Sequence, residues 1–382
     1  MKVTFIRHVL PSFPYDDYSK LSMNQLDDLA LDIVDPHVKP NQEEKIGRSL
    51  KKLRAISKDT IIVHSPNIRT RETSQIVKKV FEQNYKTTSL MEIDDLKEVF
   101  FHPSKIVDLN SKKDVNAISL LRGGIQKNLF SESGQNAVEK LSRIEERIAK
   151  IHNFILSHKK KNIIFVTHGF LLKFLQLYFL SGITDFSKLH LQTYNSTLNF
   201  DYGSGFTLTF QDGKNLTLNQ IKKRRQFFKF IKEIPYFVGD NGDDASCLTK
   251  SKKLAESLSS HGLKPVFYEC SFSWNSLGLP EAVTGLLPKN HLSKHVFLKC
   301  RIPETGDLVV LDPTWHKSFG KVQDNEWSGY NNTAISVPCK RIKILKNKNG
   351  KAISFTELEK KRIDKRKRPF VDALNNIINI TT

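Results

Sequence analysis

A cysteine, a histidine and an aspartate in the second half of the chain are placed so that they could form a thiol nucleophile with its base. Cys247 begins a helical pattern, and a helix N-terminus favours a thiolate and offers N–H groups to an oxyanion. His295 opens a strand-like segment, and Asp312 ends the next one 17 residues later. Two adjacent antiparallel strands would set the imidazole beside the carboxylate. The aspartate would then orient the histidine, which would take the thiol proton.

A second group of candidate residues, two histidines and two arginines, lies in the first half. These residues are Arg7 and His8 after the apolar segment 3–6, Arg69 after segment 60–63, and His168 after segment 162–166. Alone, each has a structural interpretation as a hydrogen-bonded histidine or a surface charge. Together they follow the ends of three segments that alternate with helical patterns, which predicts α/β layers around a mostly parallel sheet. Side chains at the carboxyl ends of such strands meet in one crevice.

Residues 1 to about 212 resemble the histidine phosphatase superfamily, also called phosphoglycerate mutase-like. Arg7-His8 is similar to its Arg-His-Gly signature, 65–73 to its Ser-Pro-x-x-Arg segment, and 167–169 to its second histidine. The resemblance implies a doubly wound, three-layer α/β domain and a phosphohistidine intermediate on a neutral His8. Cationic neighbours would keep that imidazole unprotonated.

The same resemblance implies the roles of the other site residues. Arg7 and Arg69 would bind the phosphoryl oxygens, with His168 beside the nucleophile, and Glu98 would protonate the leaving oxygen. The family's glycine after the nucleophile is Val9 here, and its side chain either crowds the phosphate or turns away. The first case would make this half a binding module. No extended loops of mutase type are recognisable, which favours a phosphatase over a mutase.

Residues from about 230 to 320 resemble the transglutaminase-like superfamily of the papain-type fold. The matching pieces are the helix led by Cys247, the turn at 261–265, the strand opened by His295, and the segment Leu311–Trp315. The family's Gly-x-Cys is Ala245-Ser246-Cys247 here. The resemblance implies an α+β domain with thiol-based acyl chemistry on a peptide or amide substrate. We favour hydrolysis, and protease, amidase, deamidase and cross-linking activities all stay open.

Composition limits the partners and the compartment. The formal net charge of +20 favours anionic partners such as nucleic acid, acidic lipid or phosphorylated molecules, through basic clusters at 159–161, 222–225 and 360–368. We expect no transmembrane segment, no metal and no cofactor. The four cysteines (Cys247, Cys270, Cys300 and Cys339) predict reduced thiols without a disulfide framework. A cytoplasmic chain is therefore expected, with translocation left open, and nothing indicates its oligomeric state.

The length of 382 residues suits two domains. We expect a phosphatase-like domain at 1–212, a basic linker at 213–228, a transglutaminase-like domain at 229–350 and a basic helix or tail at 351–382. Within the first domain we expect a helix at 137–156 and a hairpin at 197–210. The predicted function is a bifunctional enzyme. The alternatives are a chain with one active domain and one binding module, or a nucleic-acid or membrane-surface binding protein.

Overall fold

The computed structural model describes residues 1–12, 21–83, 88–106, 117–131, 137–240, 244–289, 291–314, 326–358, 363 and 365–381. The chain divides into two compact units, Met1–Leu218 and Asn219–Thr382. Each unit is described by itself below. Among the described residues, no helix is both long enough and apolar enough to cross a membrane.

The core of unit 1 is a mixed sheet in the order β3-β2-β4-β1-β5-β6. Its strands are β1 (Lys2–Arg7), β2 (Thr60–His64), β3 (Thr88–Glu92), β4 (Asn162–Thr167), β5 (Gly205–Gln211) and β6 (Lys214–Asn215). The first four strands are parallel, and β5 runs antiparallel to β1. β1, β2 and β4 are apolar and almost fully buried, as expected for strands covered on both faces.

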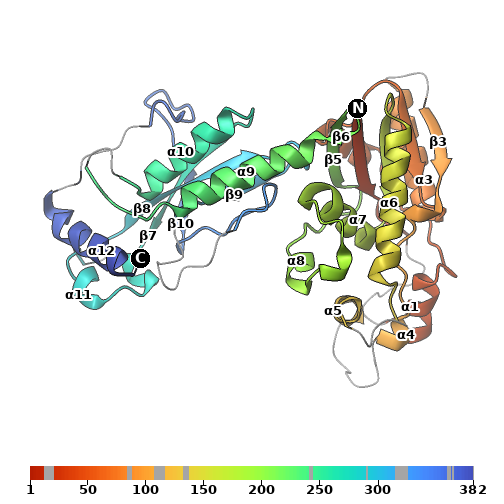
Figure 1. Cartoon of the computed structure of the whole chain (residues 1–382), viewed down its shortest axis with the longest axis horizontal. Helices are drawn as coiled ribbons and strands as arrows, with labels where there is room; N and C mark the ends of the chain where they lie inside the picture. The colour runs from red at the N-terminus through yellow and green to blue at the C-terminus, as the bar shows by residue number, and fades with distance from the viewer. Residues whose placement is uncertain are drawn as a thin grey trace. The chain divides into compact units, whose positions relative to one another are not determined.

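Helices cover both faces of this sheet (Figure 1). On one face, α2 (Glu43–Lys52) and α3 (Ile68–Glu82) share a hydrophobic cluster with Ile6, Ile62 and Ile164 of the strands. On the other face lie α6 (Leu141–Ser157), α7 (Gly169–Gln176) and the π-helical turn η5 (Leu177–Ser181). There Phe5 stacks on Phe165 and Phe179 at centroid distances of 4.9 and 5.4 Å. Alternate residues of each strand thus serve opposite layers.

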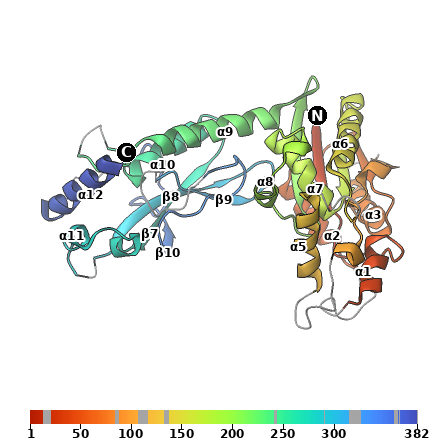
Figure 2. The ribbon, with the colours of Figure 1, turned by 60° about the horizontal axis from the view of Figure 1, so that its bottom comes forward.

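Short helices gather at one end of unit 1. Figures 1 and 2 show α1 (Met23–Ala30), α4 (Pro103–Ile106) and α5 (Ala117–Leu129) at the end opposite the chain's N-terminus. The turn η2 (Asp94–Leu96) follows β3, while η6 (Phe186–Lys188) and α8 (Leu191–Asn195) lie between η5 and β5.

Two sequence expectations meet different outcomes in unit 1. The helix expected at 137–156 is α6, which begins four residues later, at Leu141. The hairpin expected at 197–210 is wrong, because only its second half is a strand, β5. The hairpin is instead β5–β6, whose turn residues Asp212 and Gly213 take positive φ values of 51° and 78°. Asp-Gly is the turn sequence that tolerates this conformation.

The long helix α9 (Leu216–Glu233) occupies most of the segment expected to be a basic linker at 213–228. It buries Ile221, Phe228 and Ile231 at helical spacing within unit 2. Arg224, a member of the expected basic surface cluster, is buried as well. Its guanidinium donates to both carboxylate oxygens of Glu304 at 2.9 and 3.1 Å. Residues 216–233 are therefore a helix that is fixed to unit 2 by buried apolar side chains and by this ion pair.

Unit 2 contains an antiparallel sheet in the order β10-β7-β8-β9. Its strands are β7 (Pro265–Phe272), β8 (Ser293–Arg301), β9 (Leu308–Leu311) and β10 (Lys340–Ile344). Helix α10 (Cys247–Ser259) packs against β7 and β8. The helix led by Cys247 and the strands β8 and β9 stand where the sequence predicts them, within a few residues.

The last helix, α12 (Arg368–Thr381), closes a second hydrophobic cluster in unit 2. This cluster also receives β7, β8, η7 (Trp274–Leu277) and α11 (Glu281–Thr284). Phe370, Val371 and Leu374 of α12 are buried in it, and Trp274 meets Phe370 at a centroid distance of 5.3 Å. Part of the basic cluster at 360–368, namely 360–362 and 364, lies outside the described residues, as does Trp315.

The expectation of four reduced cysteines is wrong. Cys270 and Cys339 form a disulfide, while Cys247 and Cys300 are free. The pairing arises because β10 lies beside β7, with Lys340 opposite Ser271. A separation of 69 residues gave no sign of this neighbourhood in the sequence.

Candidate active sites

The first candidate site lies at the carboxyl ends of β1, β2 and β4. Parallel pairing sets Arg7 opposite Thr167, and the His8 N–H donates to the Thr167 carbonyl at 2.9 Å. This register brings the rings of His8 and His168 to a centroid distance of 5.3 Å. The structure therefore brings together residues from segments about 160 positions apart, as the sequence pattern predicts.

The tautomer of His8 follows from a hydrogen bond of its ring. Nδ1 lies 2.8 Å from the carbonyl oxygen of Val9. A carbonyl can only accept, so Nδ1 carries the proton and Nε2 keeps its lone pair. Burial, Arg69 and Arg7 hold the pKa of His8 well below its usual value, against the opposite effect of the Val9 carbonyl. The lowered pKa therefore favours the neutral form of His8, with its lone pair on Nε2.

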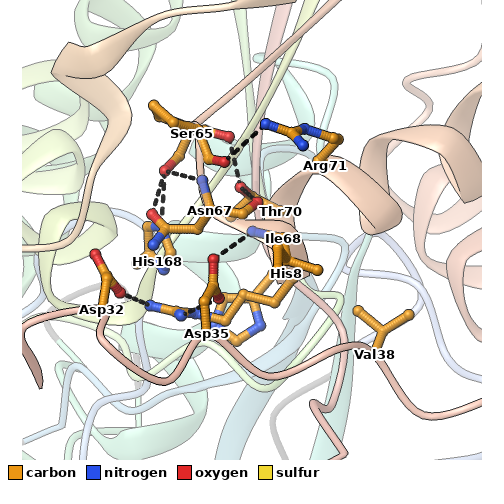
Figure 3. A network of polar contacts seen from close by, with 12 residues as sticks. His8, Asp32, Asp35, Val38, Ser65, Asn67, Ile68, Thr70, Arg71 and His168 are labelled. Carbon is orange, nitrogen blue, oxygen red and sulfur yellow. Dashed lines mark hydrogen bonds and ion pairs between the residues drawn. The ribbon is translucent and has the colours of Figure 1, made fainter. Parts of the chain in front are cut away.

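His168 is held by the loop that follows β2. Its Nε2 lies 3.0 Å from Ser65 Oγ, and that hydroxyl donates to Asn67 Oδ1 at 2.6 Å (Figure 3). Because the serine proton goes to Asn67, His168 must be the donor of the first bond. Burial, and after it the charge of Arg69, holds the pKa of His168 well below its usual value.

Val9 does not crowd this site. Its side chain is fully buried in the hydrophobic cluster with Ile46 and Leu50 of α2, and its N–H donates to Thr73 Oγ1 at 3.1 Å. Of the two orientations that the sequence left open, the structure shows the one that turns away from His8.

Residues other than the predicted site residues hold the two arginines. Arg69 donates to Asp35 Oδ1 at 2.6 Å and to Asp32 Oδ1 at 3.2 Å (Figure 3). Sequence reasoning missed both aspartates, since their segment is not recognisable from the family pattern.

Arg7 donates to the Phe200 carbonyl at 3.0 Å and lies 3.8 Å above the ring of Tyr202. Its Nε is buried and has no acceptor in the described part of the chain. Gly169 leaves room for it, because a Cβ there would lie 3.3 Å from Arg7 Cζ and Nε.

Glu98 faces the start of α7. Its carboxylate accepts from the N–H groups of Val99, Phe170 and Leu171 at 3.0, 3.2 and 2.9 Å. Burial raises the pKa of Glu98, although these bonds and Arg7 act against the shift. Asp94, in contrast, pairs with Lys97 on the surface at 2.9 Å. Glu98 thus lies against the start of α7 with a raised pKa, as a proton donor would require.

The second candidate site joins β8 and β9 to the start of α10. His295 Nε2 lies 2.7 Å from Asp312 Oδ2, and both side chains are almost fully buried. Burial alone would lower the pKa of His295, but Asp312 and Cys247 raise it to about 10 through hydrogen bonds and charge. Since Nε2 faces Asp312, Nδ1 is the ring nitrogen left for the thiol. The three residues selected from the sequence thus meet.

Asp312 is fixed by backbone and hydroxyl donors. It accepts from the N–H groups of Thr314 and Ser336 at 3.1 and 2.8 Å, and from the Thr314 hydroxyl. Burial would raise the pKa of Asp312, but His295 and these donors lower it. The carboxylate therefore stays ionised beside the imidazole.

Two further residues, Asp244 and Lys250, hold the Cys247 helix. Asp244 accepts from the Gly239 N–H at 3.1 Å, from Ser246 Oγ at 2.8 Å and from Thr249 Oγ1, and so shapes the turn before α10. Lys250 is buried, and its Nζ donates to the carbonyls of Lys232 and Thr314 at 3.1 and 3.0 Å. Burial lowers the pKa of Lys250 to about 7.

No group of three or more His, Cys, Asp or Glu side chains in the described ranges is arranged to hold a metal ion.

Solved structures similar to this chain include enzymes of phosphate chemistry. A phosphoserine phosphatase from Entamoeba histolytica is 18% identical, with a TM-score of 0.36, over 56% of this chain and 93% of its own. A phosphoglycerate mutase from Bacillus anthracis is 18% identical, with a TM-score of 0.35, over 56% and 89%. A mycobacterial glucosyl-3-phosphoglycerate phosphatase is 13% identical, with a TM-score of 0.36, over 55% and 90%.

A comparison with curated proteins gave no match. Among family models, that of the histidine phosphatase superfamily (branch 1) matches residues 33–210. The matched range includes Arg69, Glu98 and His168, and β1 brings Arg7 and His8 to them. The N-terminal unit is therefore an α/β domain of histidine phosphatase type.

Proposed function

We propose that unit 1 hydrolyses phosphomonoesters through a phosphohistidine on His8. The observation that carries this proposal is the 2.8 Å contact of His8 Nδ1 with the Val9 carbonyl, which puts the lone pair of the ring on Nε2, while Arg69 and Arg7 lower the pKa of the imidazole. Arg7 and Arg69 supply guanidinium donors, and a phosphoryl oxygen would give the buried Arg7 Nε the acceptor that it needs.

The reaction takes two steps with one proton donor. In the first, His8 Nε2 forms a bond to phosphorus, the bond from phosphorus to the alcohol oxygen breaks, and Glu98 gives that oxygen its proton. In the second, water attacks phosphorus, its proton returns to Glu98, and the bond to Nε2 breaks. Arg7, Arg69 and the Nδ1–H bond of His8 to Val9 stabilise the charges that form.

Trapping the intermediate tests this proposal. The full chain would be mixed with a ³²P-labelled phosphomonoester and quenched in alkali, which preserves phosphohistidine. We expect acid-labile label on the wild type and on Cys247→Ala, and none on His8→Ala. Label that survives in His8→Ala would overturn the assignment of the nucleophile.

For unit 2 we propose thiol-based acyl chemistry on a peptide or amide. The observation that favours it is the buried His295–Asp312 pair at 2.7 Å, with Cys247 as the other partner of the imidazole. The Cys247 sulfur would attack a carbonyl carbon and give a thioester, while protonated His295 hands its proton to the leaving amine. Water or a second amine would then release the acyl group.

Three products separate the activities within this class. Peptides with a glutamine side chain would be incubated with the wild type and with Cys247→Ala. New amino termini indicate a protease, ammonia without added amine a deamidase or amidase, and incorporation of a labelled amine a cross-linking enzyme. If the wild type forms no thioester with any acyl donor, and iodoacetamide alkylates Cys247 no faster than an exposed thiol, the proposal fails.

A further inference from the structure

The segment that carries Glu98 is held by a buried ion pair between Arg147 of α6 and Glu139, which lies two residues before that helix. Arg147 Nη1 donates to both carboxylate oxygens of Glu139 at 2.9 and 2.6 Å, and both side chains are nearly inaccessible. A buried arginine–glutamate pair is costly to desolvate and is weak evidence of stability by itself. Its other hydrogen bonds show what it holds in place.

Those bonds reach the chain on both sides of Glu98. Arg147 Nε and Nη2 donate to the Asp95 carbonyl at 3.2 and 3.1 Å, and Nη2 also donates to the Lys97 carbonyl. Beyond Glu98, the Phe100 N–H donates to Glu139 Oε2 at 3.1 Å, and the Phe100 carbonyl accepts from the Glu139 N–H at 2.8 Å. This ion pair thus binds the backbone at residues 95, 97 and 100. The backbone of Glu98, which lies between them, is therefore held in place.

A cavity of about 590 Å³ opens beside this segment. Its walls come from residues 30–32, 94–100 and 139–150, and Glu98 is among them. Ten of the 14 lining residues are charged, so the cavity suits a polar guest. If Glu98 protonates the leaving oxygen, the alcohol part of the substrate must lie beside Glu98, which is itself one of the residues that line this cavity.

We propose that the Arg147–Glu139 pair positions Glu98 as the general acid of unit 1, and that the cavity beside it receives the alcohol of a polar aliphatic phosphomonoester. This inference rests on the phosphatase activity proposed above. An aliphatic alkoxide is too basic to leave without a proton, whereas p-nitrophenolate leaves as a stable anion. An acid fixed with this many hydrogen bonds is therefore useful for an aliphatic ester and superfluous for the aryl one.

The key variant is Arg147→Lys. Lysine keeps the charge opposite Glu139, so no buried carboxylate is left unpaired, but its single ammonium group cannot hold both carbonyls as the guanidinium fork does. The control is Arg48→Lys on α2, an exposed arginine that also pairs with a glutamate, Glu44. Each variant would be compared with wild type in kcat/KM for glycerol phosphate and for p-nitrophenyl phosphate. This ratio reports only the steps up to release of the alcohol.

We expect Arg147→Lys to lower kcat/KM for glycerol phosphate about 10- to 100-fold and that for p-nitrophenyl phosphate less than about 3-fold. Glu98→Gln should show the same selectivity, and the double variant should lose little more than Glu98→Gln alone. For wild type, kcat/KM for glycerol phosphate should fall as pH rises and Glu98 loses its proton. The same fall should be weaker with the aryl ester. Arg48→Lys should match wild type throughout.

Equal losses on both esters would overturn the inference, since they indicate a structural role only, as would full activity of Arg147→Lys on glycerol phosphate. If Arg147→Lys does not fold, Glu139→Gln, which keeps an acceptor for Phe100, decides by the same ratio of esters. A wild type that cleaves neither ester and takes up no label on His8 would instead refute the proposed phosphatase activity.

Discussion

Units 1 and 2 each bury a histidine in a candidate site, and their surroundings shift the two pKa values in opposite directions. Burial, Arg69 and Arg7 lower the pKa of His8. Burial acts the same way on His295, yet Asp312 and Cys247 raise its pKa to about 10. Because both rings are almost inaccessible, the sign of the neighbouring charges decides the outcome.

This difference separates two uses of imidazole. The lowered pKa of His8 favours the neutral ring with its lone pair on Nε2, which is the form that the proposed nucleophile requires. His295 is kept protonated between a carboxylate and a thiol, which suits an ion pair in which sulfur is the nucleophile. The comparison teaches that a histidine at a strand end is ambiguous until the charges that face it are known.

The largest effect should come from removing each nucleophile. His8→Ala should lower phosphomonoester hydrolysis by about 10³-fold or more and leave alkylation of Cys247 by iodoacetamide unchanged. Cys247→Ala should abolish that alkylation and leave phosphatase kcat/KM within about 2-fold of wild type. Measuring both activities on the same preparations checks this, and loss of both in either variant would contradict the assignment of one nucleophile to each unit.

The next largest effect should come from Asp312→Asn. The amide oxygen of asparagine can still accept from His295 Nε2, but it has no charge to stabilise the imidazolium, so the pKa of His295 should fall and its proton should return to the Cys247 thiolate. We expect alkylation of Cys247 at pH 6–7 to slow by about 100-fold or more. Asp372→Asn, at an exposed aspartate of α12 paired with Arg368, is the control and should alkylate at the wild-type rate. Unchanged alkylation in Asp312→Asn would show that the carboxylate does not maintain the pair.

How far the sequence predicts these sites depends on what fixes each contact. His8, His168, Cys247 and His295 were found because each marks the beginning or end of a helix or strand whose apolar pattern is visible. The register of a parallel or antiparallel pair then brings them together. Local pattern therefore sufficed for the catalytic groups proposed here.

The groups that hold those residues were not predicted. The contacts of Asp35 with Arg69, of Arg147 with the Asp95 carbonyl and of Cys339 with Cys270 join segments that the apolar pattern does not identify as neighbours. Each alone is an ordinary surface charge, helix charge or small residue, and its partner is defined only after the chain has folded. Such contacts need knowledge of which segments become neighbours.

Stability should depend on pH in opposite ways in the two units. The folded-state pKa values of His8 and His168 are lowered, so the unfolded chain binds their protons first and unit 1 should lose stability as pH falls below 6.5. The pKa of His295 is raised to about 10, so its contribution to unit 2 is full below 6.5 and fades as pH rises toward 10. Thermal unfolding between pH 5 and 10 checks both slopes. His8→Gln should flatten the acid side and His295→Gln the alkaline side, whereas parallel slopes in both units would break the comparison.

The smallest predicted effect concerns the space around Arg7. In Gly169→Ala the new Cβ would stand 3.3 Å from Arg7 Cζ and Nε, closer than ordinary contact, so the guanidinium must move away. Because the backbone tolerates alanine there, the fold should persist while the phosphoryl contacts are displaced by a few tenths of an ångström. We expect KM for a phosphomonoester to rise on the order of 3- to 10-fold. Gly47→Ala on α2, where a Cβ meets nothing within 4 Å, should leave KM unchanged and raise the free energy of unfolding by up to about 1 kcal/mol. A Gly169→Ala enzyme with wild-type KM would mean that Arg7 does not bind the phosphoryl group in its present position. The positive charge of Arg7 would then lower the pKa of His8 without contacting the substrate.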